Sequence, residues 1–126
     1  MTNVFDYLED YKVEGRSTYP YTDTNGKCKH NSKKGLYSIE DYYQIKSNDP
    51  TAHIAALQRG PVSVAMDASG RLFAFYSSGI ISSNACGTSL NHAVNLVGYG
   101  TSSGKPYWIV RNSWGTNWGE AGYFRL

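Results

Sequence analysis

The chain has 126 residues and a formal net charge of +2, and 40% of its residues are hydrophobic and 14% aromatic. Such a composition can build a packed core, so we do not expect an intrinsically disordered chain. The small net charge gives no reason to expect a nucleic acid or a membrane surface as a partner. No apolar run reaches the roughly 18 residues that a membrane span requires, and the first residues lack the regions of a secretory signal.

The first third of the sequence predicts one helix followed by loop. An amphipathic helix is expected over residues 3–12, with Thr2 or Asn3 as its cap. Its apolar residues recur at helical spacing: Val4, Leu8 and Tyr11. Residues 16–35 are rich in turn-forming residues and predict loop. Residues 36–45 are rich in Tyr and Ile, which favours a partly extended segment.

The middle of the sequence predicts a helix, a strand and a short helical turn. Asp49 and Pro50 are typical of a helix start, and Gly60 marks where that helix should have ended. Residues 62–66 alternate apolar and small or polar side chains, which predicts a strand. Residues 72–76 form an aromatic segment that we expect to make one helical turn.

The last third predicts three strands separated by glycine-containing turns, over residues 93–99, 107–111 and 123–126. Helices early in the chain and strands late in it indicate an α+β fold with an antiparallel sheet.

The cysteines and histidines suggest no metal site. Cys28 and Cys86 can pair with each other, stay reduced, or pair with cysteines of another chain. The sequence has no Cys-x-x-Cys motif, and His30, His53 and His92 are far apart, so a zinc site is not expected.

Two polar residues inside apolar segments are the strongest candidates for function. His92 begins one predicted strand and Asn112 directly follows another, 20 positions later. A hairpin between the strands would bring the two side chains together. An asparagine oxygen accepting from the imidazole would then fix the histidine tautomer and leave the other ring nitrogen free to serve a nucleophile. Trp114 could shield this pair from water.

The spacing of His92 and Asn112 alone does not distinguish a catalytic pair from two structural residues, but the sequences of the surrounding segments do. Residues 91–100 (NHAVNLVGYG) and 107–123 (YWIVRNSWGTNWGEAGY) closely resemble the papain family of cysteine peptidases, and most of all its cathepsin L and K branch. Residues 60–68 and the Tyr-Pro-Tyr of residues 19–21 fit the same family. The resemblance covers nearly the whole chain.

The resemblance implies roles for individual residues. His92 corresponds to the catalytic base and imidazolium partner, and Asn112 to the residue that orients it. Trp114 and Trp118 correspond to the indoles that cover this pair and border the cleft. No metal or organic cofactor is implied.

The resemblance also implies a substrate pocket. Ala65 and Leu90 match positions lining the pocket for the second residue before the scissile bond, where an apolar side chain would be favoured by about 1–3 kcal/mol. Asn91 matches a position that tunes the site and whose amide or backbone contacts substrate.

The chain departs from the family at the nucleophile. The Gln-x-x-x-x-x-Cys-Gly-Ser-Cys-Trp segment, which supplies the nucleophile and the oxyanion-hole Gln, is absent from these 126 residues. Cys86 lies in a Ser-, Asn- and Gly-rich loop and not at a helix start, which argues against it as a substitute. By the same resemblance, Cys28 and Cys86 are half-cystines whose partners lie outside this chain, so an internal bridge is not expected.

We therefore expect a papain-like α+β fold in which residues 1–38 are a remnant of the helical lobe. Residues 39–126 would be the antiparallel β-barrel-like lobe carrying the catalytic histidine and asparagine. The expected function is that of a cysteine endopeptidase of which this chain supplies the His/Asn half, inactive alone and completed by an N-terminal chain or lobe. The alternatives are a non-catalytic pseudoprotease or peptide-binding scaffold, and a truncated or processed chain. Peptidases of this family work in lysosomes, in other acidic vacuoles or outside the cell.

Overall fold

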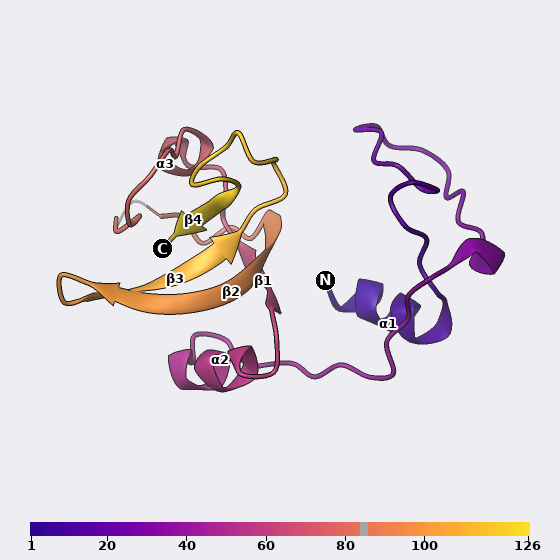
Figure 1. The fold of residues 1–126 in the computed structure, drawn as a ribbon, viewed down its shortest axis with the longest axis horizontal. Helices are drawn as coiled ribbons and strands as arrows, with labels where there is room; N and C mark the ends of the chain where they lie inside the picture. The colour runs from indigo at the N-terminus through magenta and orange to yellow at the C-terminus, as the bar shows by residue number, and fades with distance from the viewer. Residues whose placement is uncertain (84–85) are drawn as a thin grey trace. The chain divides into compact units, whose positions relative to one another are not determined.

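The computed structural model describes residues 1–83 and 86–126, which form two compact units, Met1–Gln44 and Ile45–Leu126. Figure 1 shows their elements. The first unit holds α1 (Thr2–Asp10) and the 3-10 helix η1 (Ser32–Lys34). The second unit holds helices and strands in this order: α2 (Pro50–Leu57), β1 (Val62–Met66), α3 (Arg71–Ala74), β2 (His92–Ser102), β3 (Lys105–Arg111) and β4 (Tyr123–Arg125). The predicted α+β class is confirmed.

Helix α1 is present, but neither predicted cap is used. Met1 occupies the N-cap position without a side-chain hydrogen bond, and the helix ends at Asp10. The loop after it is held by His30, whose Nε2 lies 2.8 Å from the Lys12 carbonyl oxygen and whose Nδ1 contacts the Tyr7 hydroxyl. The His30 side chain of the loop thus restrains the C-terminal end of the helix, opposite the end that lacks a side-chain cap.

The expected extended segment over residues 36–45 forms no strand. Tyr37 makes a single antiparallel bridge to Val13, and the remaining residues have no partner strand in the first unit. The β propensity of Tyr and Ile expresses itself only where a neighbouring strand supplies cross-strand contacts.

Helix α2 begins as predicted. The Asp49 carboxylate accepts a hydrogen bond from the Ala52 backbone N–H at 3.0 Å, and Pro50 occupies the first turn, where its missing N–H is not needed. The chain then leaves the helix through Gly60, whose φ of 156° is rarely adopted by other residues.

The four strands form one antiparallel sheet in the order β1-β2-β3-β4. Strands β2 and β3 are joined by a two-residue turn, Ser103–Gly104, in which both residues have positive φ. This is the mirror-image turn whose twist matches that of the adjoining strands. The predicted strands are confirmed, and β2 and β3 are each longer than expected because the turn pairs their ends.

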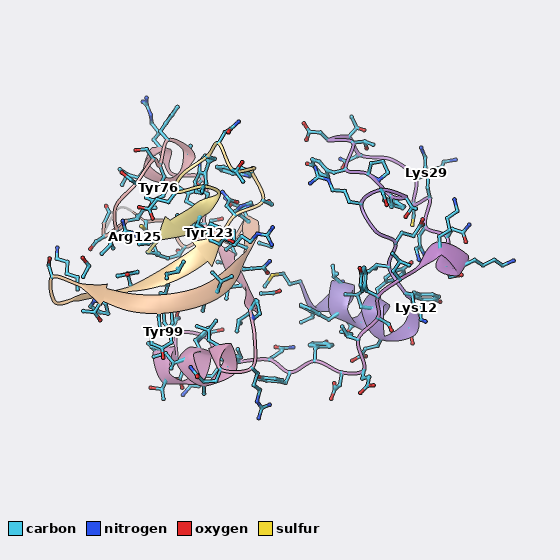
Figure 2. The ribbon with its side chains drawn as sticks, in the orientation of Figure 1. Lys12, Lys29, Tyr76, Tyr99, Tyr123 and Arg125 are labelled. Carbon is cyan, nitrogen blue, oxygen red and sulfur yellow. The ribbon has the colours of Figure 1, made fainter. Side chains whose placement is uncertain are left out.

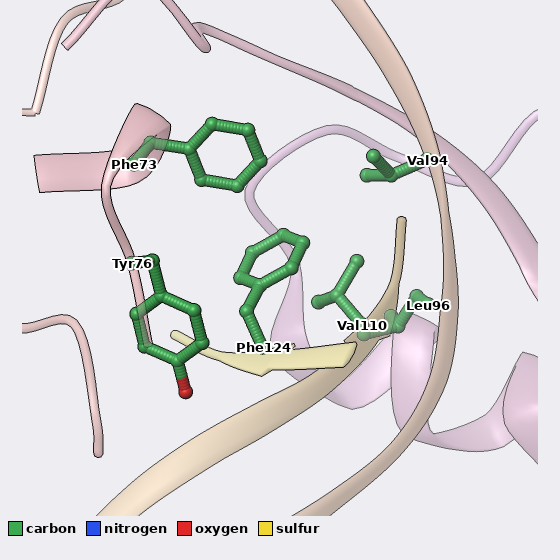
Figure 3. Close-up of a cluster of buried hydrophobic side chains, with 6 residues drawn as sticks. All are labelled: Phe73, Tyr76, Val94, Leu96, Val110 and Phe124. Atoms are coloured by element: carbon green, nitrogen blue, oxygen red, sulfur yellow. The ribbon is translucent and has the colours of Figure 1, made fainter. Parts of the chain in front are cut away.

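The core lies on one face of this sheet. Side chains from three strands meet two aromatic residues, one inside α3 and one just after it, and Figure 3 shows the cluster: Phe73, Tyr76, Val94, Leu96, Val110 and Phe124. Phe124 is fully buried, and its ring packs edge-on against Phe73 at 4.9 Å between centroids. The short helix and the last strand are thereby fixed to the same core.

A second set of contacts holds the C-terminal strand. The Glu120 carboxylate accepts from Arg125 Nη2 at 2.6 Å and Nε at 2.9 Å, and also from the Gly79 backbone N–H at 2.9 Å. The Tyr76 hydroxyl donates to the Gly79 carbonyl at 2.6 Å; Figure 2 labels Tyr76 and Arg125. Mainly through the hydrogen bonds from Arg125, the pKa of Glu120 is lowered.

Among the described residues, no helix is long and apolar enough to cross a membrane.

We predict that Phe124→Ala lowers the free energy of unfolding by about 3–5 kcal/mol, because it empties a fully buried aromatic site. Tryptophan fluorescence in urea measures it, since all three tryptophans belong to the second unit. The matched control is Phe75→Ala, whose side chain is 76% exposed and which should change stability by about 0.5 kcal/mol or less. Equal losses in both variants would contradict this core.

Glu120→Gln should cost about 1 kcal/mol at pH 7 and progressively less in acid. The folded pKa of Glu120 is depressed below the usual 4.5. Its contribution to the free energy of unfolding is therefore fully present above the unfolded pKa and is lost as the pH falls through the folded pKa. Urea unfolding of both proteins between pH 7 and pH 3 measures the difference. The exposed glutamate variant Glu40→Gln is the control. A stability gap that does not narrow in acid would contradict the ion pair.

Candidate active site around His92 and Asn112

One extra residue in β2 decides which face of the sheet carries the two polar side chains. The pairing of β2 with β3 shifts by one residue at a β-bulge around Val97. Beyond the bulge, the register sets Asn112 opposite Val94, which shares a face with His92. Without the bulge, Asn112 would stand opposite Asn95 and point to the other face.

The two side chains are in contact, as the sequence predicts. His92 is the first residue of β2 and Asn112 directly follows β3, and His92 Nε2 lies 2.9 Å from Asn112 Oδ1. The same oxygen accepts from the Ser113 backbone N–H at 2.8 Å, which sets the amide orientation. Because Oδ1 can only accept, Nε2 carries the hydrogen, and Nδ1 of the neutral ring keeps its lone pair. In this pair, His92 therefore has a defined tautomer, with its hydrogen on Nε2.

Asn112 is buried at a cost. Asn112 is only 7% exposed, and its backbone N–H donates to the Gly122 carbonyl at 2.9 Å. Its Nδ2 is buried and has no hydrogen-bond partner in the part of the chain that the structure describes. An unsatisfied buried donor costs about 1–3 kcal/mol.

Aromatic rings surround the pair. The Trp114 ring lies 5.3 Å from the His92 ring between centroids, and Trp118 packs edge-on against Trp114 at 5.2 Å. Trp118 also donates from Nε1 to the Ala74 carbonyl at 3.3 Å. Trp114 remains 44% exposed, so its ring borders solvent on one side and the histidine on the other.

Phe73 also belongs to this environment, and the sequence reading did not single it out. Its ring lies 6.0 Å from His92 and 5.2 Å from Trp114 between centroids. The available signal was the spacing of Phe73 and Tyr76 on one face of the short aromatic helix. The residue ties the imidazole to the hydrophobic core.

The expected pocket residues lie beside the start of β2. Leu90 is 68% exposed, and Ala65 is exposed on β1, next to the residue that pairs with His92. The Asn91 amide is used within the chain: Oδ1 accepts from the Ala68 N–H at 2.8 Å and Nδ2 donates to Asp67 at 3.4 Å. Leu90 and Ala65 thus both present apolar side chains to solvent.

Both cysteines are free and exposed. Cys28 lies in the first unit and Cys86 in the second. Within the described residues, no group of three or more His, Cys, Asp or Glu side chains is placed to hold a metal ion.

A hollow of about 350 Å³ lies elsewhere, between the start of α2 and the sheet. Its lining is mostly apolar and includes Val64, Trp108 and Leu126. Neither His92 nor Asn112 lines it, so it is separate from the polar pair.

The chain matches the family described as papain family cysteine protease over residues 1–126. It is 52% identical over 109 residues to cysteine proteinase COT44 of Brassica napus, covering 86% of this chain and 33% of that protein. It is 44% identical to mouse (Mus musculus) cathepsin S, covering 100% of this chain and 38% of that protein.

Solved structures agree. Procathepsin L 3 of Tenebrio molitor larval midgut has a TM-score of 0.88 and 41% identity, over 96% of this chain and 40% of that one. The bromelain protease of Ananas comosus, in complex with the E64 inhibitor, has a TM-score of 0.82 and 40% identity, over 96% of this chain and 56% of that one. The chain spans about a third of the length of the two curated relatives described above. By sequence and by fold, the chain belongs to the papain family of cysteine proteases.

Proposed function

We propose that this chain supplies the histidine and asparagine of a cysteine endopeptidase site. The observation that carries the proposal is the 2.9 Å contact between His92 Nε2 and Asn112 Oδ1, with the amide oriented by the Ser113 N–H. A histidine of fixed tautomer and an available Nδ1 is the arrangement that a thiol nucleophile requires.

The chemistry follows from that tautomer. His92 Nδ1 takes the proton of a cysteine thiol, and the imidazolium is stabilised because Asn112 Oδ1 continues to accept from Nε2–H. The thiolate then attacks the peptide carbonyl carbon. Nδ1–H returns the proton to the leaving amine, and an acyl-enzyme forms. A water molecule, deprotonated by the same nitrogen, hydrolyses the acyl-enzyme and frees the thiol.

The thiol and the oxyanion donors come, in this proposal, from a complementary N-terminal chain or lobe. The 126 residues contain two cysteines, and neither lies in a Cys-Gly-Ser-Cys-Trp segment. Residues 1–38 would belong to the helical lobe and residues 39–126 to the lobe that carries His92. Cys28 and Cys86 would form disulfides with cysteines outside this chain, which suits a lysosomal, vacuolar or secreted enzyme.

The substrate would be a peptide with an apolar residue at the second position before the scissile bond. Ala65 and Leu90 are both exposed next to the start of β2, and burying an apolar side chain against them would add about 1–3 kcal/mol. The Asn91 side chain is engaged by Asp67 and Ala68 and its backbone N–H by the Met66 carbonyl, so its backbone carbonyl is the part left for a substrate contact. Trp114 and Trp118 would border the other side of the cleft.

The purified chain alone should not cleave a fluorogenic dipeptide carrying Leu or Phe at the second position. Loss of the nucleophile lowers turnover by about 10⁶-fold, and loss of an oxyanion donor by a further 10²–10³-fold or so. A chimera that adds the remaining part of mouse cathepsin S should gain reductant-dependent turnover. In the isolated chain, Cys86→Ala and Cys28→Ala should leave the turnover as undetectable as it is without the substitution.

Thiol-dependent turnover by the isolated chain that disappears in Cys86→Ala would make Cys86 the nucleophile and overturn the proposal. A chimera that binds peptides without cleaving them would favour the scaffold or pseudoprotease alternative.

Asn112→Ala should lower kcat/KM of the active chimera by about 10²-fold, because the imidazole loses the acceptor that fixes its position and tautomer. The matched control is Asn117→Ala, which removes an exposed amide of the same loop. Steady-state kinetics on correctly folded protein provide the measurement. Equal activities for the two variants would refute the orienting role of Asn112.

A further inference from the structure

A carboxylate outside the histidine–asparagine pair fastens the segment that leads into His92. Asp67 directly follows β1, and its Oδ2 accepts from the Ser89 backbone N–H at 2.9 Å. Its Oδ1 accepts from the N–H and the hydroxyl of Ser69, at 2.9 and 2.5 Å, and from Asn91 Nδ2 at 3.4 Å. One side chain therefore holds two segments that are 22 residues apart in sequence.

Asn91 completes the connection in the opposite direction. Its Oδ1 accepts from the Ala68 N–H at 2.8 Å, and its backbone N–H donates to the Met66 carbonyl at 3.1 Å. Met66 in turn pairs with His92 across the sheet. The end of β1 and the residues before β2 are thus tied together on the side of the histidine away from Asn112.

Gly87 shows how closely the segment approaches the carboxylate. A Cβ atom on Gly87 would overlap Asp67 Oδ2. The φ of Gly87 is not in the left-handed region, so space and not backbone conformation requires glycine here. The carboxylate and the glycine are therefore a matched pair.

The chemistry of these contacts calls for an ionised carboxylate. All four contacts come from N–H or O–H donors, and the hydrogen bonds from Ser69 and then Ser89 lower the pKa of Asp67. An asparagine at this position would place its NH₂ group against at least one of these donors. Two donors cannot form a hydrogen bond with each other.

We propose that Asp67 is a positioning residue of the candidate peptidase site: its hydrogen bonds to the 87–91 segment set where His92 and the pocket residue Leu90 lie. The proposal rests on the proposed function and adds a residue that touches neither substrate nor the reacting atoms. Asn112 fixes the imidazole from β3, and Asp67 fixes it from β1.

The test follows two signals by NMR in the ¹⁵N-labelled 126-residue chain: solvent exchange of the Ser89 amide and of the His92 Nε2–H. Asp67→Ala and Asp67→Asn should each speed both exchanges by about tenfold or more, while the amides of Val94 and Val110 keep their protection. Asp67→Asn preserves side-chain size, so it decides the outcome if Asp67→Ala fails to fold. The control Ser69→Ala removes a partner of the same carboxylate outside the 87–91 segment and should leave both signals unchanged.

Gly87→Ala gives an independent measurement on the same pair. In the natural chain it should displace the carboxylate and speed both exchanges, whereas in the Asp67→Ala background it should add nothing. Unchanged exchange in folded Asp67→Asn, equal effects in Ser69→Ala, or a Gly87→Ala effect that persists without Asp67 would each overturn the proposal. Neither signal requires peptide cleavage, so the failure of this proposal is distinguishable from the failure of the proposed function.

Discussion

The antiparallel pairing of β2 with β3 places His92 at the start of one strand beside Asn112 at the end of the other. The bulge around Val97 sets both side chains on one face, and that face is also the core face. Phe73 links the two functions of the face, because its ring packs on Phe124 in the core and lies against His92 at the rim. The candidate site therefore depends on the same sheet and core that hold the second unit together.

Two polar connections then hold the histidine from opposite strands. Asn112 accepts from the ring and is itself fixed by backbone hydrogen bonds to Ser113 and Gly122. On the other side, Asp67 and Asn91 connect the end of β1 to the segment before His92. The Asn112 Nδ2 is also buried, without a hydrogen-bond partner among the described residues. Preorganisation of this kind suits a group that, in the proposed function, takes up a proton and then returns it.

Much of this architecture could be predicted because its signals are local. The Asp49 cap, the alternation in β1 and the apolar strands of the last third are each written within a few residues, and the family motifs gave the contact between His92 and Asn112. The partly extended segment expected over residues 36–45 is present only as the bridge of Tyr37 to Val13, because β propensity without a partner strand makes no sheet.

Long-range features could not be read from the sequence. The bulge at Val97 is a shift in the pairing register of two strands, and no single residue in the sequence indicates it. The Asp67 connections join positions 22 residues apart, so they emerge only when β1 and β2 pair. Phe73 was visible as an aromatic residue on a short helix, but its contact with the imidazole depends on how that helix packs on the sheet.

The central claim is that Asn112 fixes the tautomer of His92, and long-range ¹H–¹⁵N NMR of the imidazole tests it most directly. At a pH where the ring is neutral, the account predicts a protonated Nε2 and an unprotonated Nδ1, with Nε2–H correlated to the Asn112 side chain. A ring with its hydrogen on Nδ1, or one that averages between the two tautomers as a free imidazole does, would contradict it.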